Sequence, residues 1–231
     1  MALKAPKGNA KNQFPPQNNI EPGTYPARLV QRIDFGLQPQ RPYMGKDKPP
    51  AQEIGLTYEL VDEFMKDEEG NDIEDKPRWI SETLPFFGLF ADKAKSTQRY
   101  KAFDPDEAWG GDFSQAIERP INVTVVNNAV GDKVYDNVAT ISPMRPKDAE
   151  KCSPLKNPAK VFDLDAPDME VFNSFPKWIQ EKIQGNLNYE GSALQKLLKN
   201  SPAPQKNAPK KEEDKGPNPF KEEGEEDNNP Y

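Results

Sequence analysis

The sequence of 231 residues contains no histidine and a single cysteine, Cys152. One cysteine excludes a disulfide bond within the chain, and the missing histidines exclude a zinc site built from cysteine and histidine. A catalytic mechanism that needs an imidazole is excluded for the same reason. We therefore expect a protein of a reducing compartment with no metal and no cofactor.

Long apolar runs are also missing. No stretch approaches the roughly 18 apolar residues that a membrane-spanning helix needs. The N-terminal segment MALKAPKGNAKNQ lacks the apolar core of a signal peptide. These absences predict a soluble cytoplasmic protein with no membrane partner.

Sequence signatures of catalysis are absent as well. The chain has no glycine-rich phosphate loop, no GxSxG motif and no metal-ligand spacing. The carboxylate pair Asp104 and Asp106 lies in the segment FDPDE, where turn formation explains it. We expect a binding protein and not an enzyme.

The formal charge of −7 is unevenly distributed. Residues 62–75 carry −7 and residues 201–231 carry −3, which leaves +3 for the rest of the chain. A mildly basic body with acidic segments is compatible with nucleic-acid binding, although the overall charge conceals it. Segment 62–75 lacks the spacing of a calcium-binding loop, so we expect the solvated tip of a hairpin there.

The C-terminal segment 201–231 contains six prolines and no Val, Leu, Ile, Met or Trp. It cannot bury enough apolar surface to offset the entropy of ordering, so we expect a disordered acidic tail. A tail that only solubilises the protein is one interpretation, but the aromatic Phe220 and Tyr231 favour a docking peptide. The tip residues expected to bind a partner are Glu225, Glu226, Asp227, Pro230 and Tyr231.

Alternation of apolar and polar residues predicts five strands, most clearly where Ile54, Leu56, Tyr58 and Leu60 share one face. The expected strands cover residues 24–35 (with a bulge), 53–61, 77–87, 120–127 and 133–142, and a helix is expected over residues 91–103. A helix between the third and fourth of five strands is the chain order of the OB-fold barrel, so we expect a mainly β (α+β) fold of that kind. An unrelated five-stranded α+β sheet is the alternative.

Short helices are expected after this body, over residues 169–175, 177–187 and 191–200. Trp178, Ile179, Ile183 and Leu187 fall on one face of the second, which predicts packing against the barrel. The expected division of the chain is a flexible basic arm at 1–20, an OB-fold domain at 21–146, an irregular and helical appendage packed on the barrel at 147–200, and the tail at 201–231.

Single-stranded nucleic acid is bound by aromatic side chains that stack on bases and by Lys and Arg that follow the phosphates. Residues of these types occur near the surface that an OB-fold uses. The candidates are Arg28, Arg32, Arg41, Tyr43, Lys46, Lys48, Tyr58, Arg78, Trp79, Lys133 and Tyr135. Two alternatives stay open: Tyr58 and Trp79 are core residues, and Lys46 and Lys48 only keep a loop soluble. The helical cluster Lys93, Lys95, Arg99 and Lys101 is typical of a solvated helix face.

The segments YPARLVQRIDFGLQPQ, KPPAQEIGLTYELVDE and KPRWISE resemble those of a single-stranded DNA-binding protein family of tailed bacteriophages, and the acidic, aromatic-terminated tail resembles theirs too. Bacterial counterparts end in Pro-Phe, whereas this chain ends in Asn228, Asn229, Pro230 and Tyr231. The resemblance implies a protein that coats single-stranded DNA during phage DNA replication, recombination and repair in the cytoplasm of the infected cell. It also implies that the tail recruits a phage or host DNA polymerase, helicase or nuclease.

Two other functions stay open. The acidic segment 62–75 favours a phage interaction protein that binds a host enzyme by imitating DNA. A single-strand annealing protein, which would form homo-oligomers, is the other.

Overall fold

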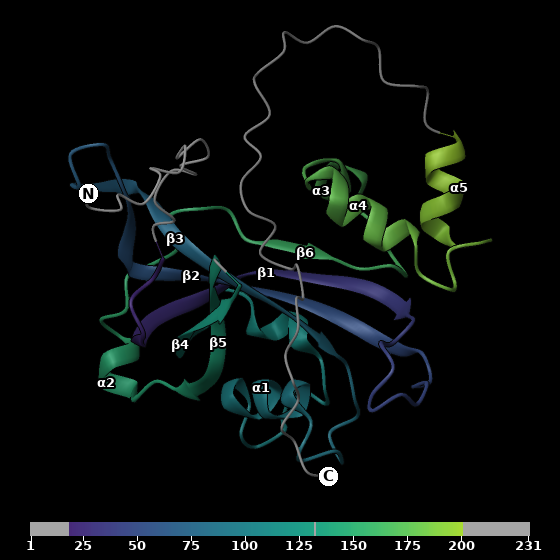
Figure 1. Ribbon diagram of the computed structural model, residues 1–231, viewed down its shortest axis with the longest axis horizontal. Coiled ribbons are helices and arrows are strands. Elements are labelled where there is room, and N and C mark those ends of the chain that lie inside the picture. The colour runs from purple at the N-terminus through teal and green to yellow at the C-terminus, as the bar shows by residue number, and fades with distance from the viewer. Residues whose placement is uncertain (1–18, 132, 201–231) are drawn as a thin grey trace, which may run out of the picture.

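The computed structural model describes residues 19–131 and 133–200, which form a mainly β fold with short helices (Figure 1). Six strands make one sheet: β1 (Gly23–Gln38), β2 (Ala51–Lys66), β3 (Asp72–Pro85), β4 (Pro120–Val130), β5 (Lys133–Pro143) and β6 (Lys160–Phe162). The five expected strands are all present and most are longer than the alternation predicts. β6 was not expected.

The strands are ordered β3-β2-β1-β4-β5, and neighbouring strands on this path run antiparallel. One edge of β1 is shared by two partners. Residues Gly23–Arg28 pair with β4, and residues Gln31–Ile33 pair in parallel with β6. β1 is therefore the central strand of the sheet, and it pairs with β2, β4 and β6.

The bulge expected in the first strand is confirmed. The register between β1 and β2 shifts between Leu29 and Gln31, and again between Asp34 and Gly36. An inserted residue reverses which side chains face each side of the sheet. As a result, Leu29 belongs to one apolar cluster and Ile33 to another on the opposite face.

The helices are short. α1 (Lys95–Phe103) and the 3-10 helix η1 (Phe113–Ala116) lie between β3 and β4, which confirms the expected helix at that place in the chain. α1 begins later than expected because the chain forms turns up to Ala94. After β5 come α2 (Pro146–Ala149), α3 (Met169–Asn173), α4 (Lys177–Gln184) and α5 (Ala193–Asn200).

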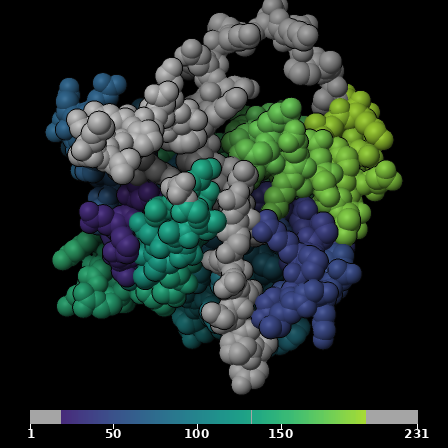
Figure 2. All heavy atoms as spheres, viewed as in Figure 1, coloured from purple at the N-terminus to yellow at the C-terminus, as the bar shows by residue number. Residues whose placement is uncertain are grey.

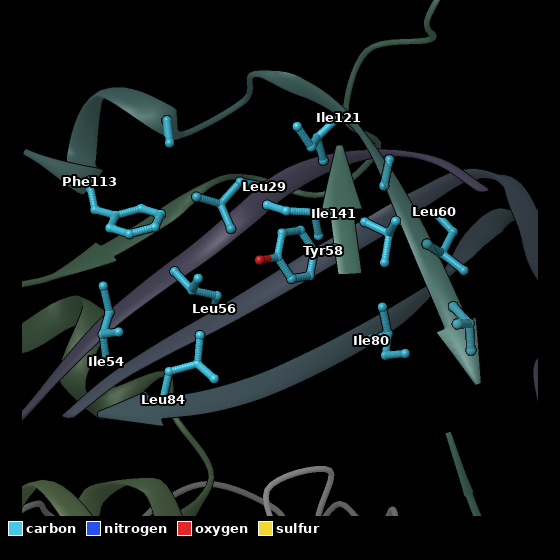
Figure 3. Packing of buried hydrophobic residues seen from close by; sticks show 14 of the residues in the cluster. Leu29, Ile54, Leu56, Tyr58, Leu60, Ile80, Leu84, Phe113, Ile121 and Ile141 are labelled. Atoms are coloured by element: carbon cyan, nitrogen blue, oxygen red, sulfur yellow. The ribbon is translucent and has the colours of Figure 1, made fainter. Parts of the chain in front are cut away.

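Two apolar clusters hold the fold together. The first lies on the concave side of the sheet, where Tyr58 sits at its centre between residues of β1, β2 and β5 (Figure 3). The second joins Ile33 and Phe35 of β1 to β6 and the C-terminal helices, through Phe162, Ile179 and other residues. The C-terminal helices thus cover the opposite face of β1, beside β6 (Figure 1).

The expected mainly β fold is confirmed, but the sheet has a sixth strand and does not close into a barrel among the described residues, because no ladder joins β3 to β5. Side chains fill the gap instead. Arg99 of α1 is 2% exposed and its guanidinium donates two hydrogen bonds to the Glu82 carboxylate of β3, at 2.9 and 3.0 Å. It also donates to the carbonyls of Val138 and Ala139 in β5, both at 3.3 Å. These β5 carbonyls bind an arginine where a closed barrel has a neighbouring strand.

Two details of the expected helices need correction. Arg99 is not part of a solvated helix face, because it is buried in the ion pair with Glu82. In α4, Ile179 and Ile183 are buried as expected, but Leu187 is 53% exposed. The helix ends at Gln184, so Leu187 lies beyond the periodicity that predicted its burial.

Candidate nucleic-acid interface

The segment between β1 and β2, predicted to be an irregular loop, carries a tight turn at Tyr43–Lys46. The backbone of Tyr43 and the backbone of Lys46 exchange two hydrogen bonds of 2.9 Å. Met44 and Gly45 both have positive φ angles, 49° and 74°, which is the geometry of a primed hairpin turn. The turn presents Met44 to solvent, 85% exposed, at a backbone conformation that such a residue rarely adopts.

Basic side chains surround this turn. Arg41, Lys46 and Lys48 are exposed, and Tyr43 is half-buried. The Lys48 ammonium lies 4.6 Å from the centre of the Tyr43 ring, a cation–π contact that holds both side chains over the turn. The four predicted residues of this segment are therefore brought together, and the segment projects from the surface in violet-blue at the lower right of Figure 2.

A second loop, residues 86–94, lies beside the first. The amide of Phe86 donates a 2.6 Å hydrogen bond to the carbonyl of Gln52, at the end of the β1–β2 segment. Phe87 is 48% exposed and Phe90 is 91% exposed. The side chain of Ser96, at the start of α1, accepts a hydrogen bond from the Phe87 amide and fixes the loop there.

Phe87, Phe90 and Met44 were missed by the sequence reasoning. Phe87 was assigned to the end of the third strand, and Phe90 lies just before the expected helix. The signal that could have found the two phenylalanines is the composition of PFFGLF, in which bulky apolar residues flank a glycine outside any alternation.

Trp79 and Tyr58 lie on opposite faces of the sheet. Trp79 is 42% exposed, and its indole nitrogen donates a 3.0 Å hydrogen bond to the Glu59 carboxylate. The N–H edge of this ring is thus fixed by Glu59, while the side chain stays partly exposed. Tyr58 is fully buried and donates its hydroxyl hydrogen bond to Glu82. The prediction of Tyr58 as a stacking platform is wrong, because no base reaches a ring enclosed by the core.

The three arginines predicted on strands contact protein groups. Arg28 donates to the carbonyls of Glu118, Cys152 and Ser153, at 2.6 to 2.8 Å. Arg32 is 9% exposed and forms an ion pair of 2.8 Å with Asp163. Arg78 lies 3.8 Å from the Asp136 carboxylate, and both side chains are largely buried. None of the three guanidinium groups lies open on the surface beside the β1–β2 segment.

Lys133 and Tyr135 lie at the start of β5, in the β4–β5 hairpin. Lys133 pairs with Val130 and is exposed, and Tyr135 pairs with Asn128 and is half-buried. The hairpin reaches β3, because Asp136 forms the ion pair with Arg78. Lys133 and Tyr135 therefore lie toward the Trp79 end of β3, separate from the β1–β2 segment at its other end.

Residues 152–157, which we call the strap, cover part of the sheet. Arg28, Glu59 and Trp79 are partners in one row across β1, β2 and β3, on the face opposite Tyr58. The fully buried Glu59 carboxylate accepts hydrogen bonds from the Lys156 amide at 2.6 Å and from the Asn157 side chain at 2.7 Å. Arg28 binds the other end of the strap. On this face, β1 and β2 are covered here and β3 is left accessible.

The acidic segment 62–75 is the distal part of the β2–β3 hairpin. Its turn is closed by Asp67, whose side chain accepts hydrogen bonds from the amides of Glu69 and Asn71. These hydrogen bonds lower the pKa of Asp67. The turn residues are exposed, which confirms the expected solvated hairpin tip.

Within residues 19–131 and 133–200, no group of three or more acidic or cysteine side chains is placed to hold a metal ion. None of the helices in that part of the chain is long and apolar enough to span a membrane. The tip residues Glu225, Glu226, Asp227, Pro230 and Tyr231, and residues 1–18 of the expected N-terminal arm, lie outside the described residues. The last two residues of that arm belong to the folded body, because Ile20 is 2% exposed in the first apolar cluster and its amide donates to Asp136.

Comparisons with known proteins give no further guide: no family model, no curated protein and no solved structure matches this chain.

Proposed function

We propose that this protein binds single-stranded DNA without strong sequence preference and coats it during phage replication, recombination and repair. The observation that carries the proposal is that the exposed Phe87 and Phe90 follow Phe86, whose amide is bonded to Gln52, two residues beyond the basic segment 39–50. Stacked aromatic side chains bind bases of any sequence, and Lys and Arg neutralise the phosphates between them.

The arrangement of strands supports an OB-type architecture for this binding. β1 pairs with both β2 and β4, a helix lies between β3 and β4, and β3 lies next to β5 without a ladder. The OB-fold is a partly open barrel that binds oligonucleotides on strands two and three, between the loops joining strands one to two and four to five. The basic turn and the tip at Lys133 belong to those two loops.

We place the DNA along β3. Pro85 pairs with Glu53 at the end near the basic turn, and Trp79 pairs with Glu59 six residues further along β2. At 3.3 Å per residue this distance is about 20 Å, which is long enough for several nucleotides. The strap blocks the path over β1 and β2, so a strand that leaves Phe87 and Phe90 reaches Trp79 and then the β4–β5 hairpin.

The test is a fluorescence titration with labelled oligo-dT at several salt concentrations. Arg41, Lys46 and Lys48 are exposed in segment 39–50, and Lys93 is exposed in the loop 86–94 that carries Phe87 and Phe90. Four such phosphate contacts give a slope of log K against log salt of about −3 for single strands. No binding at any salt concentration refutes the proposal.

A matched pair of variants locates the interface. Phe90→Ala removes a stacking partner, so we expect affinity for oligo-dT to fall about fivefold or more, at roughly 1 to 3 kcal/mol per stacked base. Leu197→Ala removes an apolar side chain that is 40% exposed on α5 and should leave affinity unchanged. If both variants lose the same affinity for oligo-dT, or if neither loses any, the DNA does not bind at Phe90.

The tail carries the second half of the proposed function. The tip Glu225–Tyr231 recruits a DNA polymerase, helicase or nuclease of the phage or host, and competes with DNA for the basic surface when DNA is absent. Deleting residues 222–231 should raise affinity for single strands at low salt and abolish capture of the polymerase. Unchanged affinity together with unchanged capture contradicts this role.

The exposed acidic hairpin favours one other candidate, a DNA mimic that binds a host enzyme. Glu68 and Glu69 lie exposed in its turn. A mimic shows no affinity for oligo-dT at any salt concentration, and its capture of a DNA-binding enzyme is lost when both residues are replaced by glutamine.

A further inference from the structure

A cavity of about 190 Å³ lies at the base of the β1–β2 segment, next to the proposed interface. Its wall includes Gln52, directly after that segment, and Phe86, directly before the exposed Phe87. Phe113 of η1 closes the apolar side, with its ring 6.2 Å from that of Phe86 in an edge-to-face arrangement. A cavity of roughly 150 Å³ holds a benzene molecule in another protein, so this one has room for a single pyrimidine ring.

Two polar groups in this cavity are incompletely satisfied. Arg32 is 9% exposed, and its terminal nitrogens bind Asp163, but its Nε has no hydrogen-bond partner among the described residues. The Oδ1 atom of Asp34 accepts hydrogen bonds from the Gly36 amide and the Gln52 side chain. Its Oδ2 atom accepts no hydrogen bond from the described residues. The site thus offers a buried donor and an acceptor on one wall.

The charge of the wall selects the ligand. Four carboxylates, those of Asp34, Glu53, Asp112 and Asp163, line the cavity with the cation of Arg32, and Lys182 pairs with Glu53 at 2.9 Å from outside the lining, so the wall keeps an excess of negative charge. Such a wall repels phosphate and favours groups that donate hydrogen bonds. Burial raises the pKa of Asp34, and a ligand that donates to its carboxylate offsets the cost of that burial. A nucleobase with an exocyclic amine supplies such donors, whereas thymine presents a carbonyl at the same position.

We propose that this cavity binds one unstacked base of the DNA strand through its Watson–Crick edge and prefers cytosine to thymine. Asp34 accepts from the amine of the base, and a ring nitrogen or carbonyl oxygen of the base accepts from Arg32. This inference rests on the proposed function and adds a modest preference at one nucleotide to otherwise sequence-tolerant binding. The phosphates of that nucleotide remain outside, near the basic turn.

The experiment compares oligo-dC with oligo-dT of the same length in the fluorescence titration. Cytosine and thymine have rings of the same size, so a difference in affinity between the two oligonucleotides reports the hydrogen-bonding groups on the edge of the base. We expect oligo-dC to bind about fivefold more tightly to the full chain, as one good polar pair discriminates between bases. Asp34→Asn keeps the Oδ1 acceptor and replaces the other oxygen by a donor, so it should abolish the preference.

Asp148→Asn is the matched control. It removes the same charge from a side chain that is 44% exposed and lies away from the cavity, in α2, so the preference should persist. Equal affinity for oligo-dC and oligo-dT in the unmodified chain overturns the inference, and so does a preference that survives Asp34→Asn. Failure of both oligonucleotides to bind refutes the proposed function itself, which is a different result.

Discussion

The side-chain bridge between β3 and β5 allows a quantitative test of how this open sheet is held together. Arg99 and Glu82 are 2% and 10% exposed, and the Tyr58 hydroxyl donates to the same carboxylate. Burial acts to lower the pKa of Arg99, but the charge of Glu82 and its hydrogen bonding to the guanidinium together outweigh burial, so the pKa is raised and the guanidinium stays charged. The pair is therefore an ion pair within the core and not a surface contact.

Arg99→Met leaves the Glu82 carboxylate buried without its cation. Breaking a buried ion pair in this way costs about 3 to 5 kcal/mol of unfolding free energy. The variant also loses the hydrogen bonds to Val138 and Ala139, so β5 loses its connection to β3 at this point. Adding Glu82→Gln removes the remaining charge and keeps an acceptor for Tyr58, so the double variant should recover at least about 1 kcal/mol of the loss.

Urea denaturation of the full chain, followed by tryptophan fluorescence, measures these differences. Hydrogen exchange should show lower protection in β5 of Arg99→Met than in β1 and β2. A loss below about 1 kcal/mol for Arg99→Met refutes the reasoning. A double variant less stable than Arg99→Met also refutes the reasoning. It would show that the unpaired charge of Glu82 is not what destabilises Arg99→Met.

Two further predictions concern single residues. In Gly55→Ala, the added carbon would lie 2.6 Å from the ring of Phe35, so we expect a loss of about 1 to 3 kcal/mol in urea denaturation; a neutral effect contradicts the observed packing. Burial acts to raise the pKa of Asp104, but hydrogen bonds from two backbone amides and a tyrosine hydroxyl outweigh it and lower the pKa. Because the pKa of Asp104 is lower in the folded state, its carboxylate stabilises the fold above the unfolded pKa of about 4, and this stabilisation is lost as the pH falls further. The difference in Tm between the unmodified chain and Asp104→Ala should therefore shrink between pH 6 and pH 3. An unchanged difference refutes this assignment.

Alternation along the chain was enough to predict β1 to β5, because each of these strands has one face in an apolar cluster. It placed the second strand at 53–61, whereas β2 runs from Ala51 to Lys66. Residues 62–66 belong to the acidic segment that predicts a hairpin tip, but Phe64 and Lys66 pair with β3, and Lys66 forms a 2.9 Å ion pair with Asp72. At this end of β2, pairing with β3 determines the extended structure, and the hydrophobic pattern of the sequence does not.

β6 could not be predicted from its own residues. It has three residues, too few to show a periodicity, and it exists because Gln31–Ile33 offer an edge that β4 has left. The same kind of long-range contact decided the binding candidates. Arg28 and Arg32 were predicted from residue type, and each is bound by residues more than 85 positions away in the chain. Exposure of a basic residue on a strand depends on such contacts.

The residues of the β1–β2 segment were easier to predict, because prolines and glycine exclude regular structure there and keep lysines at the surface. Trp79 and Tyr58 were harder. Both are aromatic residues on predicted strands, and only the pairing of Glu59 with Trp79 and of Tyr58 with Ile80 shows which one faces the core. Side-chain facing is set by register, which a sequence with irregular alternation leaves open.

The negative charge of the whole chain is a poor guide to its binding because β2 separates charges of opposite sign. Residues 62–75 carry −7 at one end of this strand, and the segment 39–50 at the other end carries +2. β2 has 16 residues and therefore spans roughly 50 Å, several times the Debye length of about 8 Å at physiological salt. Figure 1 shows the two hairpin ends on opposite sides of the molecule. The acidic end thus does not screen the basic turn, and its repulsion acts on a bound strand only where the proposed path along β3 approaches the tip, at Trp79.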